Sequence, residues 1–451
     1  MERQSRAVFA MNKMQKLWIL LLTTLTVTTA HAATQQVFQA GAANVEIELP
    51  ANVFPVEGFV GVHDPLHTRI VLLDDGKTRV GILVVDQTSL QESLIQMMKA
   101  VLESETGVMP ENSLVIASHS FSAPHVIATM AHTPEDKEKL ESLRQAILAA
   151  VKTAARMAKA SLQPAVIGYG GGTSNVNINR DAKTARGWWL GYDAAGFADH
   201  SVNVIRVDTV TGKPIAALVN YAVQSSVMDH SALTSGGSLI TADLAGAAMN
   251  YVEAYYGDRM TSAFLIGAAG DQAPQLMANR YVQKPDGSTA RIDLHEAGFT
   301  LVDMEGERLG SDIVRALESI HASQSSLLRI TRNAVTVNSQ IRAQDLPVAP
   351  VLHYTYQTGQ PVQSPVVFLK IGEIVIVGVE PELSARIGSE IKSRSPFDKT
   401  IVVTMVDGGA KYMPDEKSYE RFTYEARNSG FASGAAESAE AQILAMLDKL
   451  R

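Results

Sequence analysis

Residues 113–125 read Ser-Leu-Val-Ile-Ala-Ser-His-Ser-Phe-Ser-Ala-Pro-His. The apolar run at residues 114–117 is typical of a short strand that is buried on both faces. It changes within one residue to polar chemistry at Ser118 and His119. In open α/β sheets, ligand-binding groups lie just beyond the carboxyl ends of strands. We therefore predict that the His119 imidazole faces a cleft. The alternative is a histidine that closes the strand by bonding to a nearby carbonyl group.

The chain on both sides of this strand interleaves strands and helices without an internal repeat. Residues 68–73 and 79–85 flank the turn Asp-Asp-Gly-Lys and read as a hairpin. Residues 323–365 are the least helical part and read as a β-rich excursion. No proline-rich or serine-rich linker divides the chain, so we predict one large mixed α/β domain over residues 33–451. Further strands are expected at residues 165–168, 201–208, 216–221, 263–266, 366–370, 374–379 and 400–406, and helices at residues 89–104, 134–159, 243–256 and 435–450.

Composition limits the classes of partner. The 451 residues are 46% hydrophobic and carry a formal net charge of -8. Lysine and arginine form no cluster beyond the N-terminus, which argues against nucleic acid and anionic membranes as partners. No segment after the N-terminus approaches the roughly 20 apolar residues of a transmembrane helix. The chain has no cysteine, so it cannot form disulfides.

The first 32 residues have the pattern of a secretory signal peptide. Lys13 and Lys16 precede an apolar run at residues 17–25, and Ala30-His-Ala32 supplies small residues at the two positions that a signal peptidase reads. We therefore expect a periplasmic or secreted protein that begins at Ala33.

Five of the predicted strands run directly into polar residues. If these strands are neighbours in one sheet, their ends would surround a cleft with metal-ligand types of side chain. The chain has neither His-Glu-x-x-His nor Gly-x-Ser-x-Gly. The glycine-rich run at residues 168–172 could be a phosphate-binding nest, or only a turn. The five junctions are residues 118–119, 221–226, 270–272, 379–382 and 407–412.

Four motifs at these places, in the same order, resemble the neutral/alkaline (non-lysosomal) ceramidase family. The resemblance extends from about Gly41 to the end of the chain and implies the fold of the ceramidase catalytic domain, without the family's C-terminal immunoglobulin-like domain. The motif Thr-His-Thr-His-Ser-Gly-Pro is matched by residues 118–124, Asn-Ile-Asn-Arg by residues 177–180, Gly-Asp-Val-Ser-Pro by residues 270–274, and Tyr-x11-Tyr-Glu by Tyr412 and Tyr424-Glu425.

The resemblance implies a metal-dependent hydrolase of an amide or ester in a small or lipid-like substrate. It makes His119, Glu382 and Tyr412 ligands of a catalytic zinc ion, and it gives Arg180 and Tyr424 the task of holding or polarising the scissile amide. Zinc with an open coordination position lowers the pKa of bound water to about 7. A cationic or phenolic group at the carbonyl oxygen stabilises the developing oxyanion. The residues expected to bind the substrate are Gln224, Asp271 and Gln272.

Three positions depart from the family pattern. Gln224 stands where the family has a zinc-binding histidine, Phe121 replaces the second histidine of the Thr-His-Thr-His motif, and Ala273 replaces the serine of Gly-Asp-Val-Ser-Pro. With one imidazole replaced by an amide, manganese, iron or magnesium become alternatives to zinc.

Two other interpretations remain beside the hydrolase. The three departures also suit a ligand-binding protein without catalytic activity on the same fold. In the other interpretation the resemblance reports only shared packing, and the three proposed ligands are satisfied locally. Glu382 would then cap a helix at residues 383–391.

We predict that the exported protein begins at Ala33, because the basic, apolar and Ala-x-Ala segments occur in the order that signal peptidase requires. Mass spectrometry of protein recovered after export would check this. A mature protein that starts at Met1 or Met14 would contradict it.

Overall fold

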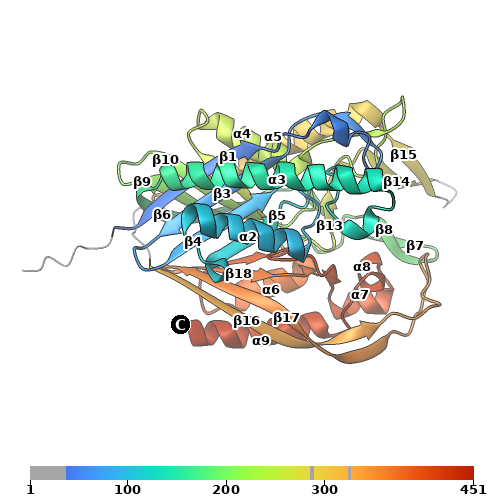
Figure 1. The fold of residues 1–451 in the computed structure, drawn as a ribbon. Coiled ribbons are helices and arrows are strands. Elements are labelled where there is room, and N and C mark those ends of the chain that lie inside the picture. The colour runs from blue at the N-terminus through green and yellow to red at the C-terminus, as the bar shows by residue number, and fades with distance from the viewer. Residues whose placement is uncertain (1–36, 285–288, 323–326) are drawn as a thin grey trace, which may run out of the picture. The chain divides into compact units, whose positions relative to one another are not determined.

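The computed structural model describes residues 37–284, 289–322 and 327–451 (Figure 1). The predicted signal peptide lies outside these residues. The mixed α/β architecture predicted from the sequence is confirmed, with helices packed on the faces of β-sheets. None of the described helices combines the length and apolar composition needed to span a bilayer.

The largest sheet has eight strands and is mostly antiparallel, with parallel pairing only between β10 and β12 and between β4 and β5. The predicted hairpin is present, because β3 and β4 pair around the turn at residues 75–78. In order across the sheet the strands are β12 (Thr261–Ile266), β10 (Pro214–Tyr221), β9 (Ser201–Thr209), β6 (Gln163–Thr173), β1 (Gln39–Glu46), β3 (His67–Asp74), β4 (Arg79–Val85) and β5 (Ser113–Ala117).

A second sheet has four strands and comes from the C-terminal third. Its order is β16 (Leu328–Ile341), β17 (Gln357–Ile371), β18 (Ile374–Val379) and β20 (Lys399–Val403). The β-rich excursion predicted at residues 323–365 forms most of the long β16–β17 hairpin, which runs along the lower edge of Figure 1. β18 and β20 are parallel.

Strand periodicity divides the core. Ile82 and Val84 enter a hydrophobic cluster shared by the two large sheets, while Leu83 and Val85 enter a cluster with the helices. This is the alternation that a pleated strand imposes on successive side chains. The helices that cover the sheets are α2 (Glu92–Thr106) and α3 (Pro134–Ala160), α4 (Asp243–Tyr255) and α5 (Gly298–Glu318), and α6 (Ala385–Arg394) and α9 (Ala435–Leu450).

Short elements complete the chain, several of them around the candidate site. They are β2 (Phe59–Val62) with β11 (Ser238–Ile240), β7 (Asn177–Thr184) with β8 (Gly187–Asp193) and β13 (Gln272–Pro274), β14 (Asn279–Gln283) with β15 (Thr289–Asp293), β19 (Glu382–Leu383) with β21 (Tyr412–Met413), and the helices α7 (Glu416–Arg421) and α8 (Tyr424–Arg427).

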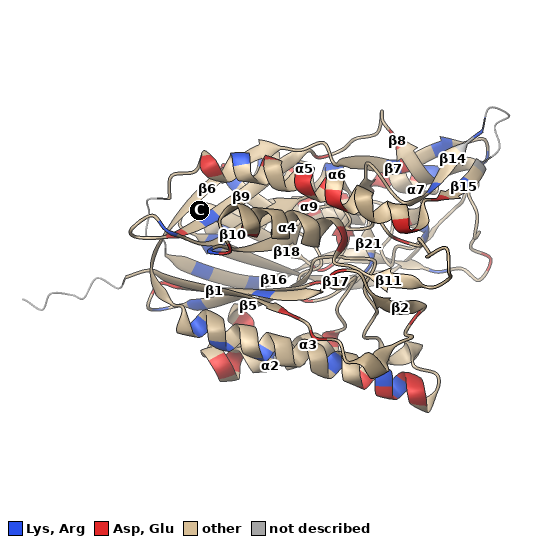
Figure 2. Cartoon of the chain, turned by 90° about the horizontal axis from the view of Figure 1, so that it is seen from above, with Lys and Arg blue, Asp and Glu red and all other residues tan. Residues whose placement is uncertain are grey.

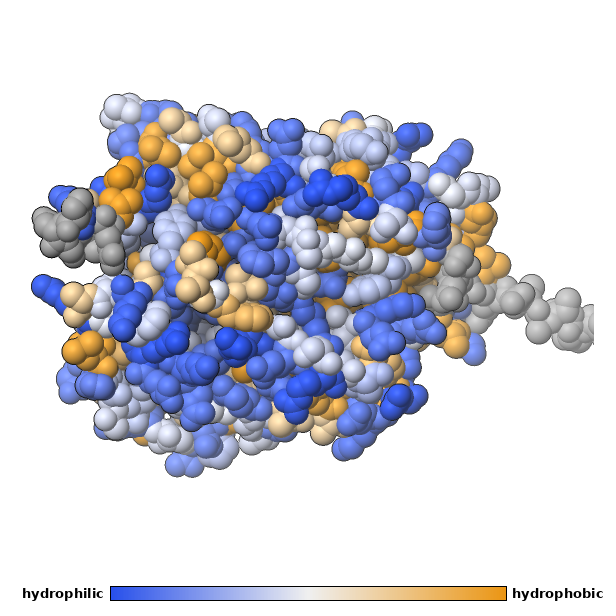
Figure 3. Space-filling view, turned by 180° about the vertical axis from the view of Figure 1, so that it is seen from behind, coloured by the Kyte–Doolittle hydropathy of each residue, from blue (hydrophilic) through white to orange (hydrophobic). Residues whose placement is uncertain are grey.

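Charged residues of both signs are distributed along the helices, as Figure 2 shows for α2, α3 and α5. The face in Figure 3 is mainly hydrophilic, with hydrophobic surface at the left end, which carries β14 and β15. The mixed distribution of charges on the helices agrees with the lack of a lysine or arginine cluster in the sequence after the N-terminus.

Two sequence interpretations need correction. The glycine-rich run at residues 168–172 is neither a nest nor a turn, because it lies inside β6. The strand predicted at residues 400–406 ends at Val403, because Met405 and Asp407 have positive φ angles of 58°. A residue in this left-handed region cannot continue an extended strand.

We predict that Gly168→Ala destabilises the protein. A Cβ atom at Gly168 would lie 2.4 Å from Cγ2 of Ile320 and 3.0 Å from Cα of Ala322, so the contact between β6 and the segment that follows α5 would have to open. Overpacking of this kind costs about 1–3 kcal/mol.

Urea unfolding measures this change. Gly430→Ala is the matched control, because nothing lies within 4 Å of a Cβ atom at that position. Equal stability of the two variants would contradict the prediction.

Candidate functional site

The five strands belong to two sheets and not to one, but backbone contacts link the segments that follow them. The segments that follow β5 and β10 pair in parallel at Ser120 and Ser225. Those that follow β18 and β20 pair as β19 and β21, with Glu382 opposite Tyr412. The backbone N–H of Gly270 donates to the Leu383 carbonyl at 2.9 Å, which adds the segment after β12. Polar residues far apart in the chain therefore converge on one buried region.

His119 and Glu382 form a buried pair at the centre of this region. Nε2 of His119 lies 3.1 Å from Oε2 of Glu382, and Nδ1 lies 2.5 Å from the carbonyl oxygen of Thr88. Burial acts to lower the pKa of His119, but the Glu382 carboxylate outweighs it and the pKa is raised. Burial acts to raise the pKa of Glu382, but His119 lowers it overall. Both shifts favour an imidazolium–carboxylate pair.

Gln224 connects this pair to Arg180. Its Nε2 atom donates to Oε2 of Glu382 at 3.0 Å, and its Oε1 atom accepts from a terminal nitrogen of Arg180 at 2.5 Å. The side chain is 1% exposed. The amide therefore points toward the carboxylate with its donor and toward the guanidinium with its acceptor.

Arg180 is held by Glu425. Its Nε and Nη2 atoms lie 2.7 and 2.6 Å from Oε1 of Glu425. Burial acts to lower the pKa of Arg180, but Glu425 outweighs this effect and raises it. Glu425 is part of the Tyr-Glu motif, but no local pattern in the sequence indicates that it holds Arg180. The guanidinium is thus fixed as a cation.

Two tyrosine rings enclose the guanidinium. Its central carbon lies 5.4 Å from the centre of the Tyr412 ring and 5.7 Å from that of Tyr424, within the range of a cation–π contact. The two rings meet edge to face at 6.0 Å. Burial, with a further contribution from Glu382, raises the pKa of Tyr412 well above its usual range.

Asp271 and Gln272 lie apart from the cavity that Arg180 and Gln224 line. Asp271 accepts from the backbone N–H of Ala385 at 2.8 Å, at the start of α6, and from Asn179 at 3.1 Å. Burial raises its pKa to about 6. Gln272 donates to the carbonyl of Phe197 at 3.1 Å. Both side chains are thus engaged in contacts with neighbouring segments.

The helix after Glu382 begins at Ala385 and not at residue 383, and Asp271, not Glu382, accepts the Ala385 N–H. The interpretation of Glu382 as a local helix cap is therefore wrong. Its carboxylate instead faces His119 and Gln224.

Metal-binding potential rests on a mixed set of donors. Among the described residues no group of three histidine, cysteine, aspartate or glutamate side chains could hold an ion. The site offers the His119 imidazole, the Glu382 carboxylate and, from the paired strand, the Tyr412 phenol. Because Nδ1 of His119 faces a backbone carbonyl, Nε2 is the nitrogen that faces the site, an arrangement common to metal-binding histidines.

The serines beside His119 do not form a serine–histidine pair with it. Oγ of Ser118 lies 3.1 Å from Oγ of Ser120, and Ser120 donates to the Ala242 carbonyl at 2.9 Å. Both ring nitrogens of His119 have other partners, Thr88 and Glu382.

A cavity of about 100 Å³ opens beside Arg180 and Gln224. Ala273 lines it, so the position where the ceramidase family has serine faces this space without a hydroxyl group. A neighbouring cavity of about 210 Å³ shares Asp229 and His230 with it and is lined by Phe121. Asp229 lies outside the four motifs, so no sequence pattern indicated that it would line these cavities.

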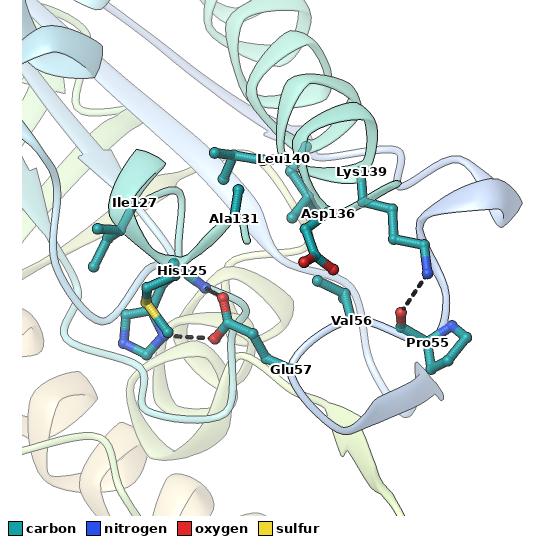
Figure 4. Close-up of a pocket in the computed structure, with 11 residues that line it drawn as sticks. Pro55, Val56, Glu57, His125, Ile127, Ala131, Asp136, Lys139 and Leu140 are labelled. Carbon is teal, nitrogen blue, oxygen red and sulfur yellow. Dashed lines mark hydrogen bonds and ion pairs between the residues drawn. The ribbon is translucent and has the colours of Figure 1, made fainter. Parts of the chain in front are cut away.

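A third cavity, of about 90 Å³, shares Glu57 and His125 with the second cavity and is not lined by Arg180 or Gln224 (Figure 4). The ring of His125 pairs with Glu57 at 2.7 Å, and Lys139 donates to the carbonyl of Pro55 at 2.9 Å. These polar groups satisfy one another. The cavity therefore offers little to a ligand.

Comparison with solved structures identifies the fold. The chain is similar to neutral ceramidase from Pseudomonas aeruginosa, with a TM-score of 0.69, 17% sequence identity, and coverage of 92% of this chain and 74% of that one. A ceramidase complexed with C2 matches with the same TM-score, 16% identity, and coverage of 92% and 75%. No family model and no curated protein sequence matches the chain. The ceramidase-like fold expected from the four motifs is confirmed.

We predict that Asp181→Asn reduces the loss of stability at alkaline pH. Asp181 is 4% exposed, and burial together with Glu425 and Asp271 raises its pKa well above the usual range of a carboxyl group. The folded protein therefore holds this proton more tightly than the unfolded chain, and the free energy of unfolding falls as the pH rises toward the raised pKa. Asparagine removes this titration.

Urea unfolding at pH 5 and pH 8 tests this expectation. The fall in stability between the two values should be smaller for Asp181→Asn than for the wild type. The exposed Asp448→Asn should behave as the wild type does. An unchanged pH dependence in Asp181→Asn would refute the role of this carboxyl group.

Proposed function

We propose that this chain is an exported hydrolase that cleaves an amide or ester bond of a lipid-like substrate with metal-activated water. The single observation that carries the proposal is the buried convergence of His119, Glu382 and Tyr412 beside Arg180, in a ceramidase-like fold. Arg180 lines the adjacent cavity, while the three proposed ligands lie buried behind it. Two solved structures with this fold are ceramidases by name. An amide of a lipid is therefore the first substrate class to test.

In this proposal the donors suit one divalent cation. His119 would supply Nε2 after the cation displaces its proton, Glu382 a carboxylate and Tyr412 a phenol whose pKa a cation would lower. Gln224 donates to Glu382 and so orients the carboxylate. Zinc is the first choice, and manganese, iron and magnesium suit the carboxylate oxygens. The ion would supply a water molecule that is a nucleophile near neutral pH.

The other residues position the substrate. Arg180 remains a cation because Glu425 holds it, so it can donate to the oxygen of the scissile carbonyl group as negative charge develops there. Tyr424 is only half-buried and packs against Tyr412, which places a second polar ring at the same site. Because these groups are held by buried partners, their arrangement needs little reorganisation during reaction.

A ligand-binding protein without catalytic activity is the second candidate. The observation that favours it is the closed network in which Gln224 satisfies both Glu382 and Arg180. Ala273 also lacks the hydroxyl group that the serine of the family motif would place on the cavity wall. Binding of an amide without turnover would establish this alternative.

Metal analysis and turnover of the purified mature protein test the proposal. The wild type should bind one equivalent of zinc or manganese and hydrolyse at least one member of a panel of N-acyl and O-acyl compounds. His119→Ala and Glu382→Ala should each lose the metal and lower kcat/KM by at least about 100-fold, because each removes a donor. Circular dichroism should show that the fold is retained.

Matched controls come from the His125–Glu57 pair. His125→Ala and Glu57→Ala remove the same two residue types from a pair that does not line the cavity beside Arg180, and they should leave the metal content unchanged. Full metal content in both site variants would contradict the proposal. Inactivation by a fluorophosphonate but not by chelators would indicate a serine nucleophile instead.

A further inference from the structure

The cavity beside Arg180 has a second feature, a pair of arginines on the β14–β15 hairpin. Arg280 in β14 and Arg291 in β15 both line it. Figure 2 shows basic residues, in blue, on β14. The hairpin therefore brings two positive charges to the wall of the cavity that also contains Arg180.

These two charges are not balanced as Arg180 is. Arg280 donates to the backbone carbonyl of Met277 at 2.9 Å. Arg291 donates to the side-chain oxygen of Asn279 and lies 5.5 Å from the centre of the Tyr281 ring. These partners are neutral, and no carboxylate among the described side chains forms an ion pair with either arginine. The contacts fix the side chains but leave the positive charges uncompensated.

One carboxyl group faces the same space. Asp229 is the only acidic residue among the described residues that line the cavity, and it lies beside His230. Burial raises the pKa of Asp229 even though His230, Arg180 and Arg291 act against that shift. This single carboxyl group faces two arginines that no ion pair among the described residues holds. The cavity wall therefore carries more basic than acidic side chains in a protein of net charge -8.

The rest of the cavity wall is largely apolar. Leu190, Ala273 and Met277 line it. Leu276 and Ile292, on and near the same hairpin, are each 38% exposed. This agrees with the hydrophobic surface at the left end of Figure 3. A ligand that suits this wall has an apolar chain and an anionic group.

We infer that the cavity selects acylated substrates that carry a carboxylate or phosphate group, which Arg280 and Arg291 bind. Guanidinium groups pair with both kinds of anion through parallel N–H bonds, and more strongly than with neutral oxygen atoms. The inference names the substrate class of the hydrolase proposed above and therefore rests on that proposal. Binding measurements alone can test the role of the two arginines, without turnover.

Calorimetric binding of two matched ligand pairs provides the test. One pair is N-octanoylglycine and its neutral amide, N-octanoylglycinamide. The other is N-octanoylethanolamine phosphate and N-octanoylethanolamine. At least one anion should bind the wild type about tenfold more tightly than its neutral partner, as expected for hydrogen bonds to a charged group. The pair with the larger ratio identifies the anion as carboxylate or phosphate.

Three variants show whether the arginines cause the preference. Arg280→Gln and Arg291→Gln should each reduce the ratio, and the double variant should bring it close to one. Arg308→Gln removes the same charge from an exposed position on α5 outside the cavity and should keep the wild-type ratio. Equal binding within both pairs, no binding of any ligand, or a full preference in the double variant would overturn the inference.

Turnover of the same compounds separates this inference from the proposed function. Anion preference without hydrolysis would support the arginine site and count against the hydrolase. Hydrolysis of neutral and charged compounds at equal kcat/KM, with equal binding, would support the hydrolase and overturn the inference.

Discussion

The buried ion pair between Arg180 and Glu425 is the constraint on which the site depends. A guanidinium removed from water needs a carboxylate close to it, and here the two residues come from β7 and α8, 245 positions apart in the chain. Loss of either partner would leave an uncompensated charge in the interior, which typically costs about 3–5 kcal/mol. The pair therefore joins the middle of the sequence to its C-terminal part and fixes Arg180 beside Gln224.

Much of the architecture follows from short-range patterns. The apolar run at residues 114–117, the hairpin around residues 74–77 and the helices at residues 134–159 and 435–450 all occur in the structure within a few residues of their predicted bounds. These elements are decided by periodicity and turn chemistry, which the local sequence contains. The predicted strand at residues 400–406 was too long, because hydrophobicity alone extends it through residues 404–406. In the structure the positive φ angle of Met405 ends the extended conformation.

The candidate site could be predicted only in part, because its contacts are long-range. The resemblance to the ceramidase family pointed to His119, Glu382, Tyr412 and Arg180, and the structure brings these four together. No local pattern indicates that the Thr88 carbonyl accepts a hydrogen bond from the His119 ring. Nor does one indicate that the Asp271 carboxylate accepts a hydrogen bond from the backbone N–H of Ala385, 114 residues away at the start of α6. Partners of this kind depend on how strand ends meet in space, which pairing and packing decide.

The presence of glutamine at position 224 affects how the site responds to pH. An amide keeps the same donor and acceptor at every pH, so its contacts with Glu382 and Arg180 do not change as protons bind or leave. An imidazole at this position would exchange a donor for an acceptor on losing a proton, and its charge would change as well. Within this network only the ionisable side chains gain or lose protons. Gln224 therefore keeps its hydrogen bonds to the Glu382 carboxylate and the Arg180 guanidinium across the pH range in which a histidine would change its charge.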